Sequence, residues 1–256
     1  MNTDNQTPLH FATQEGFTSA VELLLEKGAV IDALDKDNNT PLHLAAWGGH
    51  TDVVGLLLER GASSEAMNTD NQTPLRYAMQ EGFTTAVETL LETGAPIRAM
   101  DEDNDFLIHL AAQRGDTGVV ELLLEKGTPV KAIDRDNNTP LHVAARYGQT
   151  SVVELLLGKG ASIEAVNKDN SSPLHVAAEY GHTDVVELLL GKCASIEAMN
   201  GDNKTPLHLA AQNGHTDTVQ LLIKMASELV DERKKRKRGF VPNPDMVLGV
   251  SKRGAY

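Results

Sequence analysis

Cysteine is nearly absent from this chain of 256 residues, in which Cys193 is the only one. A single thiol excludes an internal disulfide and favours a reducing compartment. Aromatic residues make up only 4% of the sequence, whereas hydrophobic residues as a whole make up 41%. A core of useful size is therefore expected, and it must be built mainly from Leu, Val and Ala.

Segments typical of export or of membrane insertion are also lacking. The first residues, MNTDNQTPLH, do not combine a basic stretch with a following apolar run, as a signal peptide does. The longest apolar runs are far shorter than the ~20 residues of a membrane-spanning helix. We therefore expect a protein without a signal peptide or membrane contact, located in the cytoplasm or the nucleus.

Charge is distributed unevenly along the chain, whose net charge is −13. Residues 227–256 contain eight Lys or Arg and four Asp or Glu, a balance of +4. Residues 1–226 contain 15 basic and 32 acidic side chains, a balance of −17. The sequence thus predicts an acidic body followed by a short basic segment.

A motif recurs at one constant interval, without an insertion. TPLH begins at Thr7, Thr40, Thr139 and Thr205, and the variants TPLR, FLIH and SPLH begin at Thr73, Phe106 and Ser172. The starts at 7, 40, 73, 106, 139, 172 and 205 are evenly spaced and define seven units, numbered one to seven below. A fixed period of this length is typical of a solenoid built from stacked repeats.

Each unit is predicted to contain a turn, a short helix and a longer helix. In unit two, Thr40 and Pro41 form a helix start, and Gly48 with Gly49 ends that helix. Thr51 opens a second helix with the apolar run of VVGLLL, which stops before Gly61. One unit cannot bury its apolar faces alone, so neighbouring units are expected to stack.

The segment TPLHLAAWGGHTDVVGLLLERGA and its copies resemble the ankyrin repeat, whose signature is T-P-L-H-x-A with a period of about 33 residues. The resemblance covers residues 1–226. It implies an all-α ankyrin-repeat solenoid of helix-turn-helix units with projecting β-turn fingers. It also implies protein binding through the fingertips and the concave face of the inner helices.

Several positions depart from the family pattern. The finger turn carries Asn where the family usually has Gly, and Asn is the next best residue for positive φ. Unit four has Phe106 and Leu107 in place of Thr-Pro, with Asp105 as an alternative cap, and unit three has Arg76 in place of the motif histidine. Cys193 replaces the glycine after the second helix of unit six. These units are the expected weak points of the array.

The C-terminal part is predicted to differ from the repeats. Apolar residues keep helical spacing from Val219 to Val230 and basic residues follow them, which predicts one extended helix from Thr216 to Arg238. We divide the chain into the repeat domain 1–226, a basic helical extension 227–238 and a disordered tail 239–256. Six consecutive cations end the extension: Arg233, Lys234, Lys235, Arg236, Lys237 and Arg238. This run resembles a nuclear import signal; a solvated helix end, a nucleic-acid contact and a processing site remain as alternatives.

Residues capable of catalysis or metal binding recur at repeat positions, which favours structural roles. Six of the nine histidines belong to the motif, and three follow the glycine between the helices. In ankyrin repeats the motif histidine ties neighbouring loops by hydrogen bonds. No phosphate-binding loop or nucleophile elbow string occurs. We therefore expect no enzyme activity, no cofactor, no metal, no small-molecule substrate and no nucleic-acid partner.

Positions that vary while the scaffold stays constant are candidates for binding, because packing does not fix them. Tyr, Trp and Arg are common anchors of protein interfaces. The residues chosen on this basis are Lys36, Trp47, Arg114, Arg135, Arg146, Tyr147 and Tyr180. A second row, at the finger base, is predicted to pack between fingers, whereas exposure would indicate adaptable binding. This row consists of Met67, Met100, Ile133, Val166 and Met199.

The function that these features favour is a non-catalytic scaffold or adaptor that binds a protein partner and is itself a monomer. Two alternatives remain from the sequence. In the first alternative, the chain is a fragment of a longer ankyrin toxin or effector. In the second, it is the substrate-recruiting module of an enzyme complex.

Overall fold

A computed structural model describes residues 2–95 and 106–237 of the chain. These residues form fourteen α-helices and no strand. The short inner helices are α1 (Pro8–Gln14), α3 (Pro41–Trp47), α5 (Pro74–Glu81), α7 (Phe106–Arg114), α9 (Pro140–Arg146), α11 (Pro173–Tyr180) and α13 (Pro206–Gln212). The outer helices are α2 (Thr18–Glu26), α4 (Thr51–Glu59), α6 (Thr84–Glu92), α8 (Thr117–Glu125), α10 (Thr150–Gly158), α12 (Thr183–Gly191) and α14 (Thr216–Lys237).

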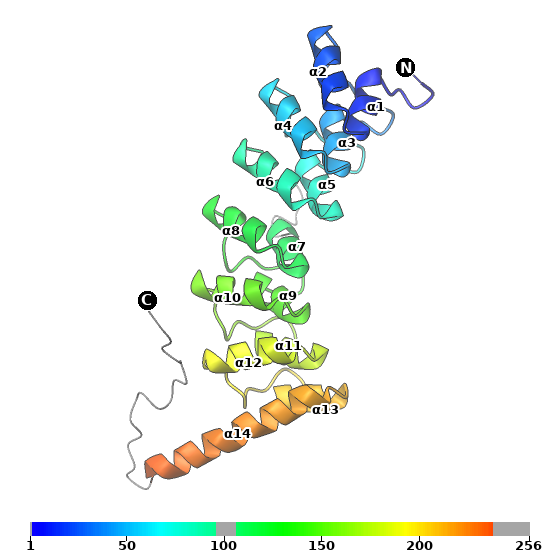
Figure 1. Cartoon of the computed structure of the whole chain (residues 1–256). Helices are drawn as coiled ribbons and strands as arrows, with labels where there is room; N and C mark the ends of the chain where they lie inside the picture. The colour runs from blue at the N-terminus through cyan, green and yellow to red at the C-terminus, as the bar shows by residue number, and fades with distance from the viewer. Residues whose placement is uncertain (1, 96–105, 238–256) are drawn as a thin grey trace, which may run out of the picture.

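Each unit contributes one inner and one outer helix, and the pairs stack in chain order into an elongated array (Figure 1). The inner helices form one row and the outer helices a second row beside it. This confirms the predicted all-α solenoid. The last outer helix, α14, runs on past the end of the array, so the predicted long C-terminal helix is confirmed as far as Lys237. The expected tail and Arg238 lie outside the described residues.

The helix starts follow from the Thr-Pro pair. In α3 the backbone N–H of His43 donates to the Thr40 hydroxyl at 3.4 Å, while the backbone N–H of Thr40 donates to Nδ1 of His43 at 3.1 Å. This reciprocal pair satisfies donors that a helix start leaves open. Pro41 fits the next position because it has no N–H to lose.

A single core runs the length of the array between the two rows of helices. Unit two contributes Ala45 and Ala46 from α3 and Val53, Val54 and Leu57 from α4, all at most 1% exposed. The alanines allow neighbouring inner helices to approach closely, and each fully buried leucine contributes roughly 2 kcal/mol. The core therefore combines contacts within units and between them.

The fingers are tight turns that pair with one another. The predicted positive φ at the finger asparagines is confirmed, with values between 55° and 62° at the six that are described. Asn104 and the alternative cap Asp105 lie outside the described residues. Backbone bonds then connect successive fingertips: the N–H of Lys36 donates to the Asp4 carbonyl at 2.9 Å, and that of Lys168 to the Asp136 carbonyl at 3.0 Å.

The motif histidines also connect the units, which confirms the structural role expected for them. His142 shows the arrangement: Thr139 N–H donates to Nδ1 at 3.1 Å, so Nε2 carries the proton and donates to the Ser171 carbonyl at 3.0 Å. The same bond to a carbonyl further along the chain is made by His10, His43, His109 and His175.

The predicted burial of the finger-base row is wrong. Ile133, Val166 and Met199 are 49%, 51% and 59% exposed, and Met67 is half-buried. The reason is that backbone bonds between the turns hold the fingers together, so these side chains are not needed between them. Met100 lies outside the described residues.

Candidate functional site

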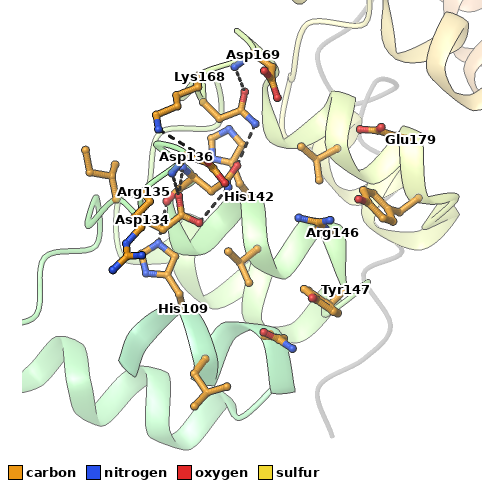
Figure 2. A pocket seen from close by; sticks show the side chains of 18 residues that line it. His109, Asp134, Arg135, Asp136, His142, Arg146, Tyr147, Lys168, Asp169 and Glu179 are labelled. Atoms are coloured by element: carbon orange, nitrogen blue, oxygen red, sulfur yellow. Dashed lines mark hydrogen bonds and ion pairs between the residues drawn. The ribbon is translucent and has the colours of Figure 1, made fainter. Parts of the chain in front are cut away.

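A groove of about 890 Å³ lies between the inner helices and the fingers of units four to six. Its residues come from α7, α9 and α11 and from two finger turns, residues 133–138 and 167–169. Figure 2 shows the charged finger side chains on one side and Arg146, Tyr147 and Glu179 on the other. The groove therefore has a floor and two chemically different walls.

The floor is apolar and contains one residue from each unit. Leu110, Val143 and Val176 occupy the same register of consecutive units; the first two are half-buried and the third is buried. Phe11 and Tyr77 occupy this register in units one and three and are larger. Small floor residues leave room above the inner helices of units five and six, which explains why the groove lies there.

The helix-end wall is aromatic and charged. Tyr147 and Tyr180 occupy equivalent positions in adjacent units and are 46% and 42% exposed. The guanidinium carbon of Arg146 lies 4.8 Å from the centre of the Tyr180 ring, which is a cation–π contact. His182 donates to the Arg146 carbonyl at 2.8 Å and so fixes the end of α9. Two exposed rings are thus presented one unit apart.

The finger wall is held in place by its own turns. Asp134 accepts bonds from the backbone N–H groups of Asp136 and Asn138, both at 2.8 Å, and from the Asn138 side chain at 3.0 Å. Burial raises the pKa of Asp134, but these hydrogen bonds outweigh it and hold the pKa below its usual value. Lys168 pairs with Asp136 at 3.6 Å. The finger wall therefore carries fixed charges of both signs.

His142, below the groove, is engaged in structural hydrogen bonds. Both ring nitrogens of His142 are used by the backbone, and burial lowers its pKa although nearby carbonyls oppose the shift. The ring therefore stays neutral and is not available as a general base. Among the described residues, no group of three or more His, Cys, Asp or Glu side chains is arranged to hold a metal ion.

Four of the seven predicted contact residues lie together in this groove: Arg135, Arg146, Tyr147 and Tyr180. The other three lie elsewhere. Lys36 pairs with Asp4 at 2.9 Å, Trp47 ends α3 with 45% of its surface exposed, and both terminal nitrogens of Arg114 donate to the Gln80 carbonyl at 3.0–3.1 Å. Sequence reasoning missed the floor, although the size of the residue at this register was readable from unit to unit.

No described helix has the length and apolar character needed to cross a membrane.

Comparisons with known proteins agree with this architecture. A family model described as Ankyrin repeats (3 copies) matches residues 1–68, 75–167 and 163–233. A comparison with curated proteins gives no match. The crystal structure of the human ASB11 ankyrin repeat domain is similar, with a TM-score of 0.73, 30% identity and coverage of 86% of this chain and 98% of that one.

A second similar structure is the ankyrin repeat domain of Bcl-3, described as a unique member of the IkappaB protein family. Its TM-score is 0.65 at 32% identity, over 84% of this chain and 98% of that one. Because the family model covers most of the sequence and the stacked helix pairs match solved ankyrin domains over nearly their whole length, this chain belongs to the ankyrin repeat family.

Proposed function

We propose that the chain is a non-catalytic scaffold that binds a protein partner in the groove of units four to six. The observation that supports this most is the convergence of Arg135, Arg146, Tyr147 and Tyr180 on one groove. They were chosen from the sequence because they vary between units and because Tyr and Arg are common anchors of protein interfaces. Exposed tyrosines above an apolar floor are the kind of anchor on which protein interfaces depend.

The groove chemistry favours binding over catalysis. Its one partly buried carboxylate of lowered pKa, Asp134, is bonded within its own turn, and the buried His142 is neutral with both ring nitrogens bonded to the backbone. Neither group is placed to move a proton to or from a substrate. The interface that such a groove offers is an apolar strip with polar edges, as in protein–protein contacts.

The test is capture of partners by the full chain from extracts of cells that express it, compared with the double variant Tyr147→Ala/Tyr180→Ala. Both rings are exposed, so the variant is expected to keep its helix content by circular dichroism. Binding should weaken by more than ~1 kcal/mol. Glu121→Ala/Glu154→Ala on the outer helices is the matched control. Loss of binding in this control alone would assign the partner to the other face.

A further inference from the structure

The floor and the tyrosine wall of the groove repeat at the spacing of the units, and this spacing limits what can lie along them. Neighbouring inner helices packed through alanine are separated by about 8–10 Å. Leu110, Val143 and Val176 occupy one register of three consecutive units, and Tyr147 and Tyr180 occupy another, so we expect both rows to repeat at this spacing. A partner segment that contacts every unit of the groove must therefore place one side chain at each interval of about 8–10 Å along its length.

Only some backbone conformations meet this condition. In a β-strand the side chains of one face recur about every 6.6 Å, which is shorter than the spacing of the units. Successive side chains of a strand would therefore not lie over successive inner helices. A polyproline II helix has three residues per turn and rises about 9.3 Å per turn, which matches the unit spacing. An α-helix returns a side chain to the same face only at every seventh residue, and seven residues rise about 10.5 Å, which is longer than the unit spacing.

The three faces of a polyproline II segment also match the three sides of the groove. One residue in three meets the floor at Val143 and Val176, and the next meets the wall of Tyr147 and Tyr180. Aromatic rings are the surfaces on which proline-rich segments dock. The third residue faces the fingers, where Asp136 and Lys168 already pair with each other.

Charge gives the segment a preferred end. Asp169 and Glu179 both belong to unit six and lie on opposite walls of the groove, and both are exposed. Neither forms an ion pair with any described residue. The repeat domain as a whole is strongly acidic, with 32 acidic and 15 basic residues in 1–226. Asp169 and Glu179 therefore favour a cation at the unit-six end, where Lys168 is already paired with Asp136, and the acidic array attracts a cation at long range.

We propose that the partner segment bound in this groove is a polyproline II stretch with an apolar side chain at every third residue and a Lys or Arg at the unit-six end. This proposal rests on the proposed function and specifies its partner. The apolar side chains occupy the floor, the intervening prolines pack on Tyr147 and Tyr180, and the cation pairs with Asp169 and Glu179.

The test uses the full chain and labelled synthetic peptides, with binding followed by fluorescence anisotropy. The first peptide has Leu at every third position, Pro between and Lys at each end. The second has the same composition with the leucines in one block. The third is an alanine-based helix of equal charge with Leu at every seventh position. We expect the first to bind at least about tenfold more tightly than the others. Equal binding of the first two, or tightest binding of the third, overturns the proposal.

Protein variants locate the binding. Val143→Tyr fills the floor with the residue that the fold already accepts at Tyr77, and it should weaken binding of the first peptide about tenfold. Leu44→Tyr makes a similar change at the same register outside the groove and should have no effect. Tyr147→Ala/Tyr180→Ala repeats the test without touching the floor. Binding that none of these variants weakens also overturns the proposal.

The outcome separates this proposal from the function on which it rests. If the full chain captures a protein through Tyr147 and Tyr180 but does not bind the first peptide, the segment chemistry is wrong and the protein-binding groove stands. If neither a protein nor the peptide depends on these tyrosines, both proposals fail.

Discussion

Buried motif histidines make the stability of the array depend on pH. Burial lowers the pKa of His43, His142 and His175 below the ordinary 6.5, and hydrogen bonds to backbone carbonyls offset this only in part. As the pH falls through 6.5, the unfolded chain therefore takes up protons that the folded chain resists. Stability from this source is fully present above pH 6.5 and is lost as the pH falls through the lower folded pKa values.

We expect the free energy of unfolding in urea to decrease between pH 7.5 and pH 5.5. The measurement is made in about 0.5 M salt, which screens the repulsion among surface carboxylates. Without screening, acidification also relieves the net charge of −13, which acts in the opposite direction. An unfolding free energy that stays constant or rises on acidification at high salt contradicts the role given to these histidines.

Cys193 stores backbone strain at the end of α12. Its φ is 69°, and the equivalent residues of the earlier units, such as Gly160 at 89°, are glycines. A side chain at Gly160 would meet open space, so the cost lies in the backbone and not in a clash. Cys193→Gly should raise the free energy of unfolding by about 1 kcal/mol, and Gly160→Cys should lower it by a similar amount. An unchanged denaturation midpoint for Cys193→Gly would show that no strain is stored there.

Single residues also show where sequence reasoning succeeded and where it stopped. The positive φ of the finger asparagines and of Cys193 was predictable, because few residues tolerate that conformation. Arg114 illustrates the limit: its guanidinium holds the Gln80 carbonyl, the bond that His50 makes to Gln14 in unit two. Unit four has Asp116 at the register of His50. Arg114 thus replaces the missing histidine of unit four as the residue that bonds the preceding unit. This replacement depends on distances between side chains, which the repeat pattern of the sequence does not contain.

At the scale of elements, we expect unit four to be the weak point of the stack. It lacks the Thr-Pro start, and α5 and α7 pack less closely than the other neighbouring inner helices. Among the interior units, amide hydrogen exchange should be fastest over residues 101–127, because local opening follows loose packing. Uniform protection from unit two to unit six would count against this prediction.

A repaired variant provides the control for that experiment. Phe106→Thr with Leu107→Pro restores the start found in unit five and should slow exchange in α7 and α8, with a gain in stability of about 1 kcal/mol. Exchange in α3 and α4 should not change, because a solenoid unit contacts only its neighbours. Faster exchange in the repaired variant would mean that Phe106 and Leu107 stabilise the unit as they are.

Most elements were predictable from the sequence because the same signals occur in nearly every unit. Thr-Pro pairs mark the inner helices and glycines mark their ends, so the helix order and α14 were expected. The finger-base row was predicted wrongly, because an apolar residue in a turn suggests burial while the turns pair through their backbones. Four wall residues of the groove were among the predicted contact residues, because these positions vary between units. The floor was not predicted, because it depends on side-chain size at one register.

At the scale of the whole molecule, charge separates the acidic array from the basic end of α14. Arg233 and Lys234 are exposed there, and Arg233 lies 3.5 Å from Glu197 of unit six. An exposed pair of this kind contributes at most about 1 kcal/mol, so it does not hold Arg233 firmly against the array. We propose that Arg233–Arg238 acts as a nuclear import signal in a eukaryotic cell.

Two fusions test this proposal. Residues 227–256 joined to a fluorescent reporter should carry it into the nucleus, and the same segment with six alanines in place of Arg233–Arg238 should not. In the full chain, the alanine substitutions should shift the protein toward the cytoplasm. A reporter that stays cytoplasmic, with an unchanged distribution of the substituted full chain, would leave the run as a solvated helix end.

Binding in the groove of units four to six is most directly tested by photocrosslinking in cells that express the chain. A photoreactive residue replaces Tyr147 in the groove or, in a separate variant, Glu154 on the outer helix α10, where the side chain is exposed. We predict crosslinks to a partner protein from position 147 and none from position 154. Crosslinks from position 154 alone would contradict the assignment of the groove as the binding site.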